Sequence, residues 1–132
     1  MIRSLLLNKL FVVYGDKHNT PDGTCVRDYV NVSDVVEAHV LAMKYLEKLP
    51  LGYYAALNIA TGEGCSVLEL IDSIKLQSDS FLDWSYGKDR KGDPAKVVGS
   101  NKLANELLGW APTISLNQSV KETLNSFGNI FI

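Results

Sequence analysis

Arg27 is the first residue in the sequence whose type and setting suit ligand chemistry. It follows a Pro-Asp-Gly turn at 21–23 and precedes Asp28 and Tyr29. The planar guanidinium of arginine matches the oxygens of a phosphate, and a neighbouring tyrosine can add a hydroxyl contact or a stacking surface. The alternative is an exposed ion pair between Arg27 and Asp28, worth about 0–1 kcal/mol. The residues alone leave both interpretations open.

A second candidate site lies at 90–93, where the chain reads Arg-Lys-Gly-Asp. Arg90 suits a phosphate, and Asp93 suits the hydroxyl groups of a sugar, because a carboxylate only accepts hydrogen bonds. Gly92 lets the backbone approach a ligand closely. The alternative is a solvent-exposed turn, since charged turns that contain Gly and Pro are common.

Other patterns in the chain indicate no site. Gly62-x-Gly64 precedes a helix, but position 67 is Val, so the pattern lacks the third glycine of a dinucleotide-binding loop. His18 and His39 have no cluster of ligating residues around them, and we expect no metal site. No nucleophile and base with recognisable spacing occur, so we predict no catalytic residue.

Composition and charge exclude several classes of partner. The net charge is −2 and the pI is about 5.6, so no basic field is available for nucleic acid or anionic lipid. No run of about 18 apolar residues could span a membrane. Cys25 and Cys65 allow one disulfide, but two free thiols in a reducing compartment are favoured. We therefore expect a cytoplasmic protein.

Alternating helices and strands must position the candidate residues. Ser33 is the predicted N-cap of one helix, while Ser66 with Glu69 and Ser115 with Gln118 form two capping boxes. The alternation predicts an α/β fold, with few good strands for a complete doubly wound sheet. The patterns predict helices over 2–9, 33–48, 66–76, 100–109 and 115–127, and strands over 10–14, 30–32, 53–60, 81–86 and 96–99.

Two of these predicted elements are unusually apolar. The helix over 33–48 carries an apolar stripe much wider than the roughly 100° of an ordinary surface helix. The run over 53–60 suits a strand that is buried on both faces. Both elements therefore need cover on more than one side.

Longer stretches of the sequence resemble a known family. TPDGTCVRDYVNVSDVVEAHVLAM resembles a signature of the UDP-glucose 4-epimerases, which are NAD-dependent members of the extended short-chain dehydrogenase/reductase superfamily. ALNIATGEGCSVLELI and DRKGDPAKVVGSNKLANELLGWAP are similar to later segments of the same family. The resemblance covers residues 5 to about 125 in the family's order. It implies an enzyme class that inverts C4 of a nucleotide sugar by transient oxidation with NAD.

The resemblance also shows what this sequence does not contain. The Gly-rich NAD loop and the catalytic Tyr-x-x-x-Lys of the family are absent. Residues 1–132 therefore resemble the C-terminal, substrate-binding half of an extended short-chain dehydrogenase/reductase, with one helix and one strand that would complete a missing Rossmann sheet. NAD belongs to the full-length family and is not expected to bind this chain alone, which we expect to be inactive.

The resemblance assigns roles to residues that match the family's motifs. Arg27 and Arg90 match arginines that contact the diphosphate, Asp93 matches an aspartate that accepts from ribose hydroxyls, and Tyr29 matches a substrate contact. The remaining matches are a strand whose edge meets uracil and a packing residue near the nucleotide: Val12, Val13, Tyr14 and Val67. The implied partner is a UDP-sugar.

Exposed apolar surface on the uncovered elements predicts association, either as a homo-oligomer or with a Rossmann half. Two alternatives to the epimerase-like function stay open. The chain could be half of another nucleotide-sugar epimerase or dehydratase. It could also be a non-enzymatic interaction domain whose exposed apolar helix is the binding face.

Overall fold

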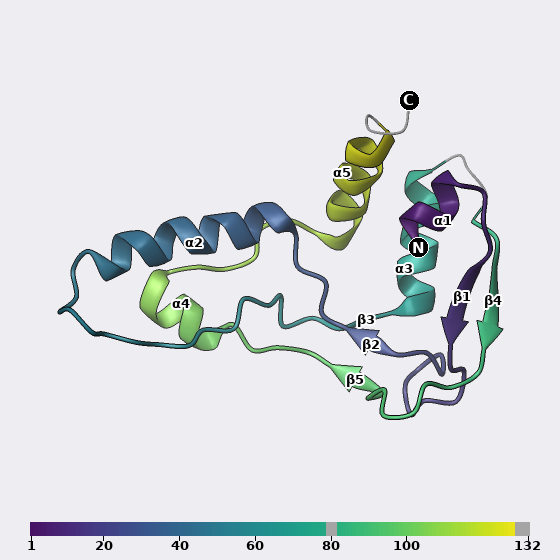
Figure 1. Ribbon diagram of the computed structural model, residues 1–132, viewed down its shortest axis with the longest axis horizontal. Coiled ribbons are helices and arrows are strands. Elements are labelled where there is room, and N and C mark those ends of the chain that lie inside the picture. The colour runs from purple at the N-terminus through teal and green to yellow at the C-terminus, as the bar shows by residue number, and fades with distance from the viewer. Residues whose placement is uncertain (79–81, 129–132) are drawn as a thin grey trace.

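The computed structural model describes residues 1–78 and 82–128, which form an elongated α/β structure (Figure 1). The predicted α/β class is confirmed. The helices are α1 (Ile2–Leu6), α2 (Val32–Leu46), α3 (Val67–Gln77), α4 (Lys102–Leu108) and α5 (Leu116–Gly128). The strands are β1 (Phe11–Tyr14), β2 (Val26–Arg27), β3 (Cys65–Ser66), β4 (Trp84–Gly87) and β5 (Lys96–Val97).

The strands form two small sheets. β1 and β4 pair in parallel, with Tyr14 opposite Gly87 at their carboxyl ends. In the second sheet β2 is central, antiparallel to β3 and parallel to β5, with Arg27 opposite Val97. The chain turns back from the carboxyl ends of β1 and β4 to β2 and β5 (Figure 1), so the loops that follow the first sheet reach the residues around β2.

One hydrophobic core lies at the end of the molecule that holds α1, α3, α5, β1 and β4. α3 and α5 pack against each other, and Ile71 and Ile74 of α3 are almost completely buried. The amphipathic spacing predicted for α5 is borne out by the burial of Val120. The buried members of this core are Leu5, Val13, Ile71, Ile74, Leu82 and Val120.

A smaller core lies at the other end of the molecule, between α2 and α4. Trp110 is its largest member, and its indole Nε1 donates to the carbonyl oxygen of Asp34 at 2.9 Å. The carboxylate of Asp34 accepts from both Thr113 N and Ile114 N, which joins α2 to the chain before α5. Within the described residues, α2 packs on this core by its inner side.

Of three predicted helix caps, one is confirmed, one is half formed and one is wrong. Ser66 and Glu69 form the predicted capping box of α3. Ser115 Oγ accepts from Gln118 N at 3.3 Å, whereas the Gln118 side chain donates to Glu122, so the second box is only half formed. The N-cap of α2 is Asn31, not Ser33, because the Asn31 side chain accepts from the Ser33 amide.

Two predicted strands do not form. Residues 30–32 lead into α2, and the strand next to the candidate site is β2, four residues earlier. Residues 53–60 have no strand pairing in the described part of the chain, and Tyr54 is 86% exposed. A strand needs a neighbour for its backbone N–H and C=O groups, which no described strand supplies here. The predicted strand over 81–86 begins at Trp84, and Phe81 lies outside the described residues.

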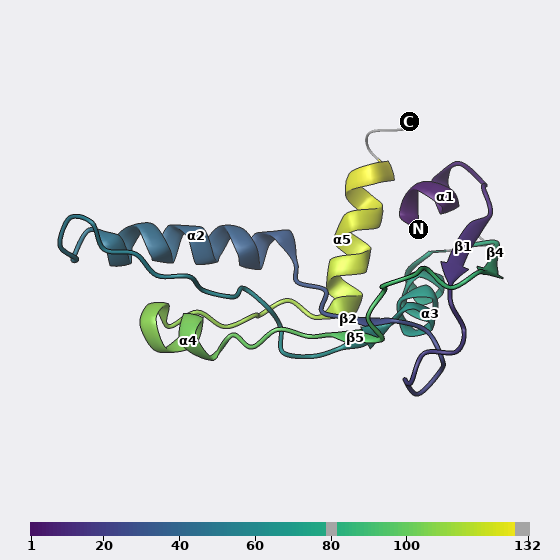
Figure 2. The same ribbon diagram turned by 60° about the horizontal axis from the view of Figure 1, so that its bottom comes forward.

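α2 lies along one edge of the molecule (Figure 2), and its outer face is apolar and exposed. Val32, Val36 and Met43 are 73%, 57% and 60% exposed, and Leu46 continues the same stripe. We call these four residues the α2 stripe. The unusually apolar helix predicted from the sequence therefore lacks cover on its outer side. No helix among the described residues is long and apolar enough to cross a membrane.

Candidate functional site

Arg27 lies at the centre of the candidate site because β2 pairs with β5 on one side. This pairing brings Arg27 beside residues 93–97. Its Nη1 donates to the carbonyl oxygens of Val26 and Pro94 at 2.8 and 2.9 Å, and its Nη2 forms an ion pair with Asp93. The alternative of a local ion pair between Arg27 and Asp28 is not what the structure shows. Arg27 pairs with Asp93, which is 66 residues away in the sequence.

Asp28 instead holds the loops around the site together. Its carboxylate accepts from the Thr61 amide and hydroxyl and from the amides of Gly62 and Gly99. Burial alone would raise the pKa of this carboxyl group, but the four hydrogen bonds outweigh burial and lower it. Asp28 is therefore a structural anion that fixes the strand carrying Arg27.

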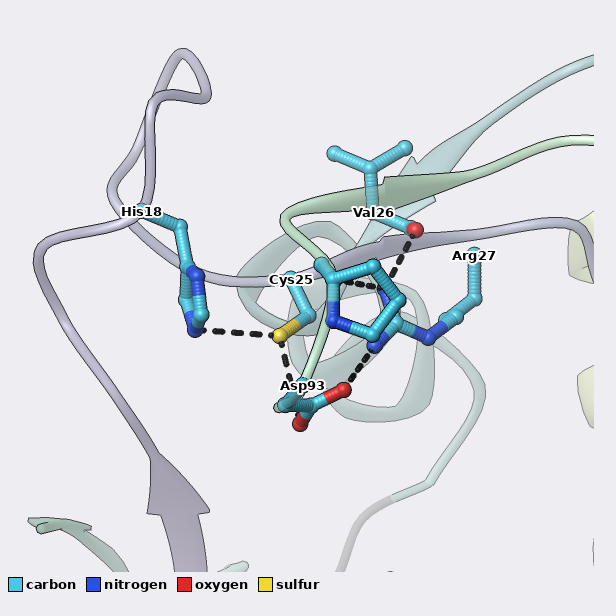
Figure 3. Close-up of polar contacts among 6 residues, drawn as sticks. His18, Cys25, Val26, Arg27 and Asp93 are labelled. Atoms are coloured by element: carbon cyan, nitrogen blue, oxygen red, sulfur yellow. Dashed lines mark hydrogen bonds and ion pairs between the residues drawn. The ribbon is translucent and has the colours of Figure 1, made fainter. Parts of the chain in front are cut away.

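Cys25 and His18 extend the polar network behind Asp93 (Figure 3). The Cys25 thiol lies 3.6 Å from Asp93 Oδ2 and 3.2 Å from His18 Nε2. Burial, and then the nearby Asp93 carboxylate, raise the pKa of Cys25, so the thiol stays protonated and can donate. In the described residues, no group of three or more His, Cys, Asp and Glu side chains could hold a metal ion.

Gly15 is needed for His18 to reach this position. Its φ is +85°, a region that favours glycine, and a Cβ there would lie 2.6 Å from His18 Nε2. The tight turn after β1 thus brings the imidazole ring back toward Cys25.

Arg90 and Tyr14 form the second part of the site. The Arg90 guanidinium carbon lies 3.7 Å from the centroid of the Tyr14 ring, which is a cation–π contact. Tyr14 ends β1 and Arg90 follows β4, so the parallel pairing of these strands brings the two side chains together. The Asp93 amide donates to the Arg90 carbonyl oxygen, which links this pair to the Arg27–Asp93 pair.

The other predicted site residues lie elsewhere. Tyr29 lines a separate cavity of about 550 Å³ between the 61–65 segment and the start of α5, and burial raises the pKa of its phenol. Val13 is 1% exposed in the main core and could meet a ligand only through its backbone. Val12 packs against Gly87, and Val67 begins α3 at the edge of the core.

Gly62-x-Gly64 forms no open phosphate cradle. A Cβ on Gly64 would lie 2.5 Å from Val26 Cγ1 and 2.9 Å from Val98 Cγ2. The missing side chain therefore allows Gly64 to pack closely against β2 and the residue that follows β5.

The arrangement around Arg27 can bind an anion. A guanidinium has five N–H groups. In the described part of the chain, the Arg27 guanidinium donates to three acceptors, on Val26, Pro94 and Asp93. Two N–H groups remain for a ligand. Asp93 keeps spare acceptor capacity, since a carboxylate offers about four lone-pair sites. A phosphate and a hydroxyl group from one ligand could therefore bind side by side.

Sequence analysis missed Cys25 and His18. One signal for Cys25 was available, because alternate residues of a strand point to the same face and Cys25 lies two positions before Arg27. No comparable signal existed for His18, whose position depends on the turn at Gly15.

Comparisons with known proteins agree with this fold. A family model described as GDP-mannose 4,6 dehydratase matches residues 1–123. The chain is 42% identical over 106 residues to the UDP-glucose 4-epimerase of Rhizobium meliloti (strain 1021). The matched stretch covers 80% of this chain and 32% of that relative. The chain therefore spans about a third of the length of this relative.

Two solved structures share the architecture. The UDP-glucose 4-epimerase from Bifidobacterium longum in complex with NAD⁺ and UDP has a TM-score of 0.87 at 28% identity, and covers 97% of this chain and 38% of its own. The UDP-glucose 4-epimerase of Thermotoga maritima with UDP-glucose has a TM-score of 0.82 at 32% identity, covering 99% of this chain and 38% of its own. The chain therefore belongs to the NAD-dependent epimerase/dehydratase family of the extended short-chain dehydrogenase/reductases, and corresponds to the C-terminal part of a UDP-glucose 4-epimerase-like protein.

Proposed function

We propose that residues 1–132 form a single nucleotide-sugar-binding domain that binds the UDP part of a UDP-sugar in an enzyme of the UDP-glucose 4-epimerase type. One observation carries this proposal. Arg27 and Asp93, 66 residues apart, meet where the segment before β5 lies beside β2, and Arg27 retains two N–H groups for an anion. The relatives whose names include UDP or a UDP-sugar support the choice of nucleotide.

In this proposal each side chain binds one part of the nucleotide. Arg27 and Arg90 hold the diphosphate, and Asp93 accepts from the ribose hydroxyls. Tyr14 ends the strand segment Val12–Tyr14 beside the uracil, and this residue is 41% exposed. Tyr29 and Val67 contribute to the walls of the substrate site.

We further propose that this chain alone does not turn over substrate. NAD supplies hydride transfer at C4 of the sugar in the full-length family, and residues 1–132 contain neither the family's Gly-rich NAD loop nor its Tyr-x-x-x-Lys. The role of this half is to hold the UDP while the sugar is oxidised and reduced elsewhere.

The occupant proposed for the α2 stripe is the cofactor-binding part of the family fold. The chain spans about a third of its relatives, so about two thirds of a relative's length has no counterpart here. The apolar α2 stripe and the unpaired 53–60 segment lie at the same end of the molecule, next to α4 (Figure 1). Together they offer such a partner an apolar helix face and a segment whose backbone pairs with no strand in the described part of the chain.

Calorimetric titration with UDP tests the nucleotide proposal. Arg27→Ala and Arg90→Ala should each weaken UDP binding by about 1–3 kcal/mol, because each removes a charged hydrogen-bond donor. Arg3→Ala on α1 is the matched control, since Arg3 is an exposed arginine outside the site. UDP binding that is unchanged in both site variants would refute the residue assignments.

A panel of nucleotides separates the alternative functions. Tighter binding of dTDP or GDP sugars than of UDP sugars would indicate half of another nucleotide-sugar epimerase or dehydratase. No nucleotide binding together with a stable protein complex through α2 would indicate the interaction domain.

Sedimentation velocity tests the partner proposal. The chain should form a complex with the N-terminal two thirds of the Rhizobium meliloti relative, and Val36→Lys should weaken it because a charge replaces an apolar contact. Glu37→Lys, a neighbouring change outside the α2 stripe, is the control. A homodimer of the chain that Val36→Lys abolishes would assign the α2 stripe to a second copy instead.

A further inference from the structure

The Asp93 carboxylate has a protein contact on each of its two oxygens. One contact is an ion pair, and the other is with a neutral thiol. Its Oδ1 pairs with Arg27, while its Oδ2 lies 3.6 Å from the thiol of Cys25 (Figure 3). Cys25 is 5% exposed and sits one residue before β2. The thiol and the Arg27 guanidinium leave the same face of the extended chain, so they approach Asp93 together.

The direction of the thiol hydrogen depends on His18. A thiol has one hydrogen to donate, and two acceptors compete for it, Asp93 Oδ2 and an unprotonated His18 Nε2. When Nε2 carries a hydrogen, His18 donates to the sulfur and the thiol donates to Asp93. His18, Cys25 and Asp93 then form a directed chain of hydrogen bonds that ends on the carboxylate.

The hydrogen bonds from Cys25 and Arg27 fix the Asp93 carboxylate and still leave it free acceptor sites. Two protein donors occupy about two of its four lone-pair sites, and the others stay available. Asp93 has a side chain that is 26% exposed, so the free sites are open to solvent or to a ligand. A carboxylate held on both oxygens presents these sites in one orientation, which lowers the entropic cost of binding.

We propose that Cys25, held by His18, is a positioning residue that orients Asp93 toward the ribose hydroxyls of the nucleotide. This inference rests on the proposed function, because it needs a nucleotide in the site. In this role the Cys25 thiol contributes to selectivity for ribose over sugars that lack the 2′ and 3′ hydroxyl groups.

The test compares two ligands, UDP and 2′,3′-dideoxy-UDP, by calorimetry on the whole chain. We expect the unaltered chain to prefer UDP by about tenfold or more, since hydrogen bonds to a carboxylate are lost with the hydroxyls. Cys25→Ala should reduce this preference several-fold while binding of the dideoxy ligand changes little. Cys25→Ser keeps a hydroxyl donor and should retain the preference, which a purely structural role would not require.

His18→Leu provides a second, independent variant if Cys25→Ala does not fold. It removes the group that directs the thiol, lies in a half-buried loop position, and should also reduce the preference for UDP. An unchanged preference in Cys25→Ala or, where that variant does not fold, in His18→Leu overturns this inference and leaves the proposed function standing. Failure of the unaltered chain to bind either ligand overturns the proposed function, and this inference with it.

Discussion

The two ends of the molecule differ in how their helices are covered. At one end α3 packs against α5 and against β1 and β4, and Ile71 is completely buried. At the other end α2 packs on α4 by its inner side only, and its outer α2 stripe is exposed. The core around α3 and α5 is covered by elements of the described chain. The core around α2 and α4 covers only one side of α2 in the described chain. Apolar content alone thus does not decide burial.

Shortening a buried side chain should give the largest contrast between the two ends. Ile71→Ala should lower the free energy of unfolding by about 2–5 kcal/mol, because it leaves a cavity in the closed core. Val36→Ala, in the α2 stripe, should change it by about 0.5 kcal/mol or less. Urea unfolding of both variants measures the difference. An equal loss in the two would mean that the α2 stripe is buried in the protein in solution.

Asp28 offers the next largest effect, because its carboxylate ties the residue after β2 to the 61–62 turn and to Gly99. Asp28→Asn should cost about 1–3 kcal/mol at neutral pH, since an amide cannot accept from all four donors. The pKa of Asp28 is lowered in the fold, so its stabilisation is present above the unfolded pKa and is lost as the pH falls through the folded value.

The gap in unfolding free energy between the unaltered chain and Asp28→Asn should therefore be constant above about pH 5 and shrink below about pH 4. Urea unfolding at a series of pH values measures it. A gap that widens on acidification would show that the hydrogen bonds do not stabilise the anion. Asp72→Asn is the control, since Asp72 is an exposed carboxylate.

Helix caps should give a smaller effect that is similar at both ends. Ser66→Ala removes the N-cap of α3 and Asn31→Ala removes that of α2, each worth about 0.5–2 kcal/mol. Asn31 also donates to Ser119 and Glu122 of α5, so its loss should lie at the upper end. Thermal unfolding of both variants provides the comparison, and a negligible loss in Asn31→Ala would contradict a structured start of α2.

Surface ion pairs should give the smallest effect. Lys75 pairs with Asp72 on α3, and Lys102 lies 3.9 Å from Glu106 on α4, all with exposed side chains. Lys75→Ala and Lys102→Ala should each change the free energy of unfolding by about 0.5 kcal/mol or less. A larger loss, measured in the same urea experiment, would indicate contacts beyond these pairs.

Local patterns predicted the elements that depend on local forces. The capping box of Ser66 and Glu69, the stripe of α5 and strand β1 follow from short-range hydrogen bonding and periodicity. The strand over 53–60 failed, because strand formation depends on a neighbour and not on the residues of the strand itself. The N-cap of α2 was misplaced by two residues, since Asn and Ser are both good caps and only the backbone geometry separates them.

The sequence by itself determined the residue chemistry of this protein. It identified an arginine suited to a phosphate, an aspartate suited to sugar hydroxyls, and a helix too apolar to be exposed to solvent on its whole outer face. Only the tertiary structure decided that Arg27 pairs with Asp93 and not with its neighbour Asp28, and that Cys25 and His18 join them. The physical reason is that side-chain partners are set by strand pairing between distant segments. The pairing of β2 with β5 brings Arg27 to Asp93, which lies 66 residues away in the sequence.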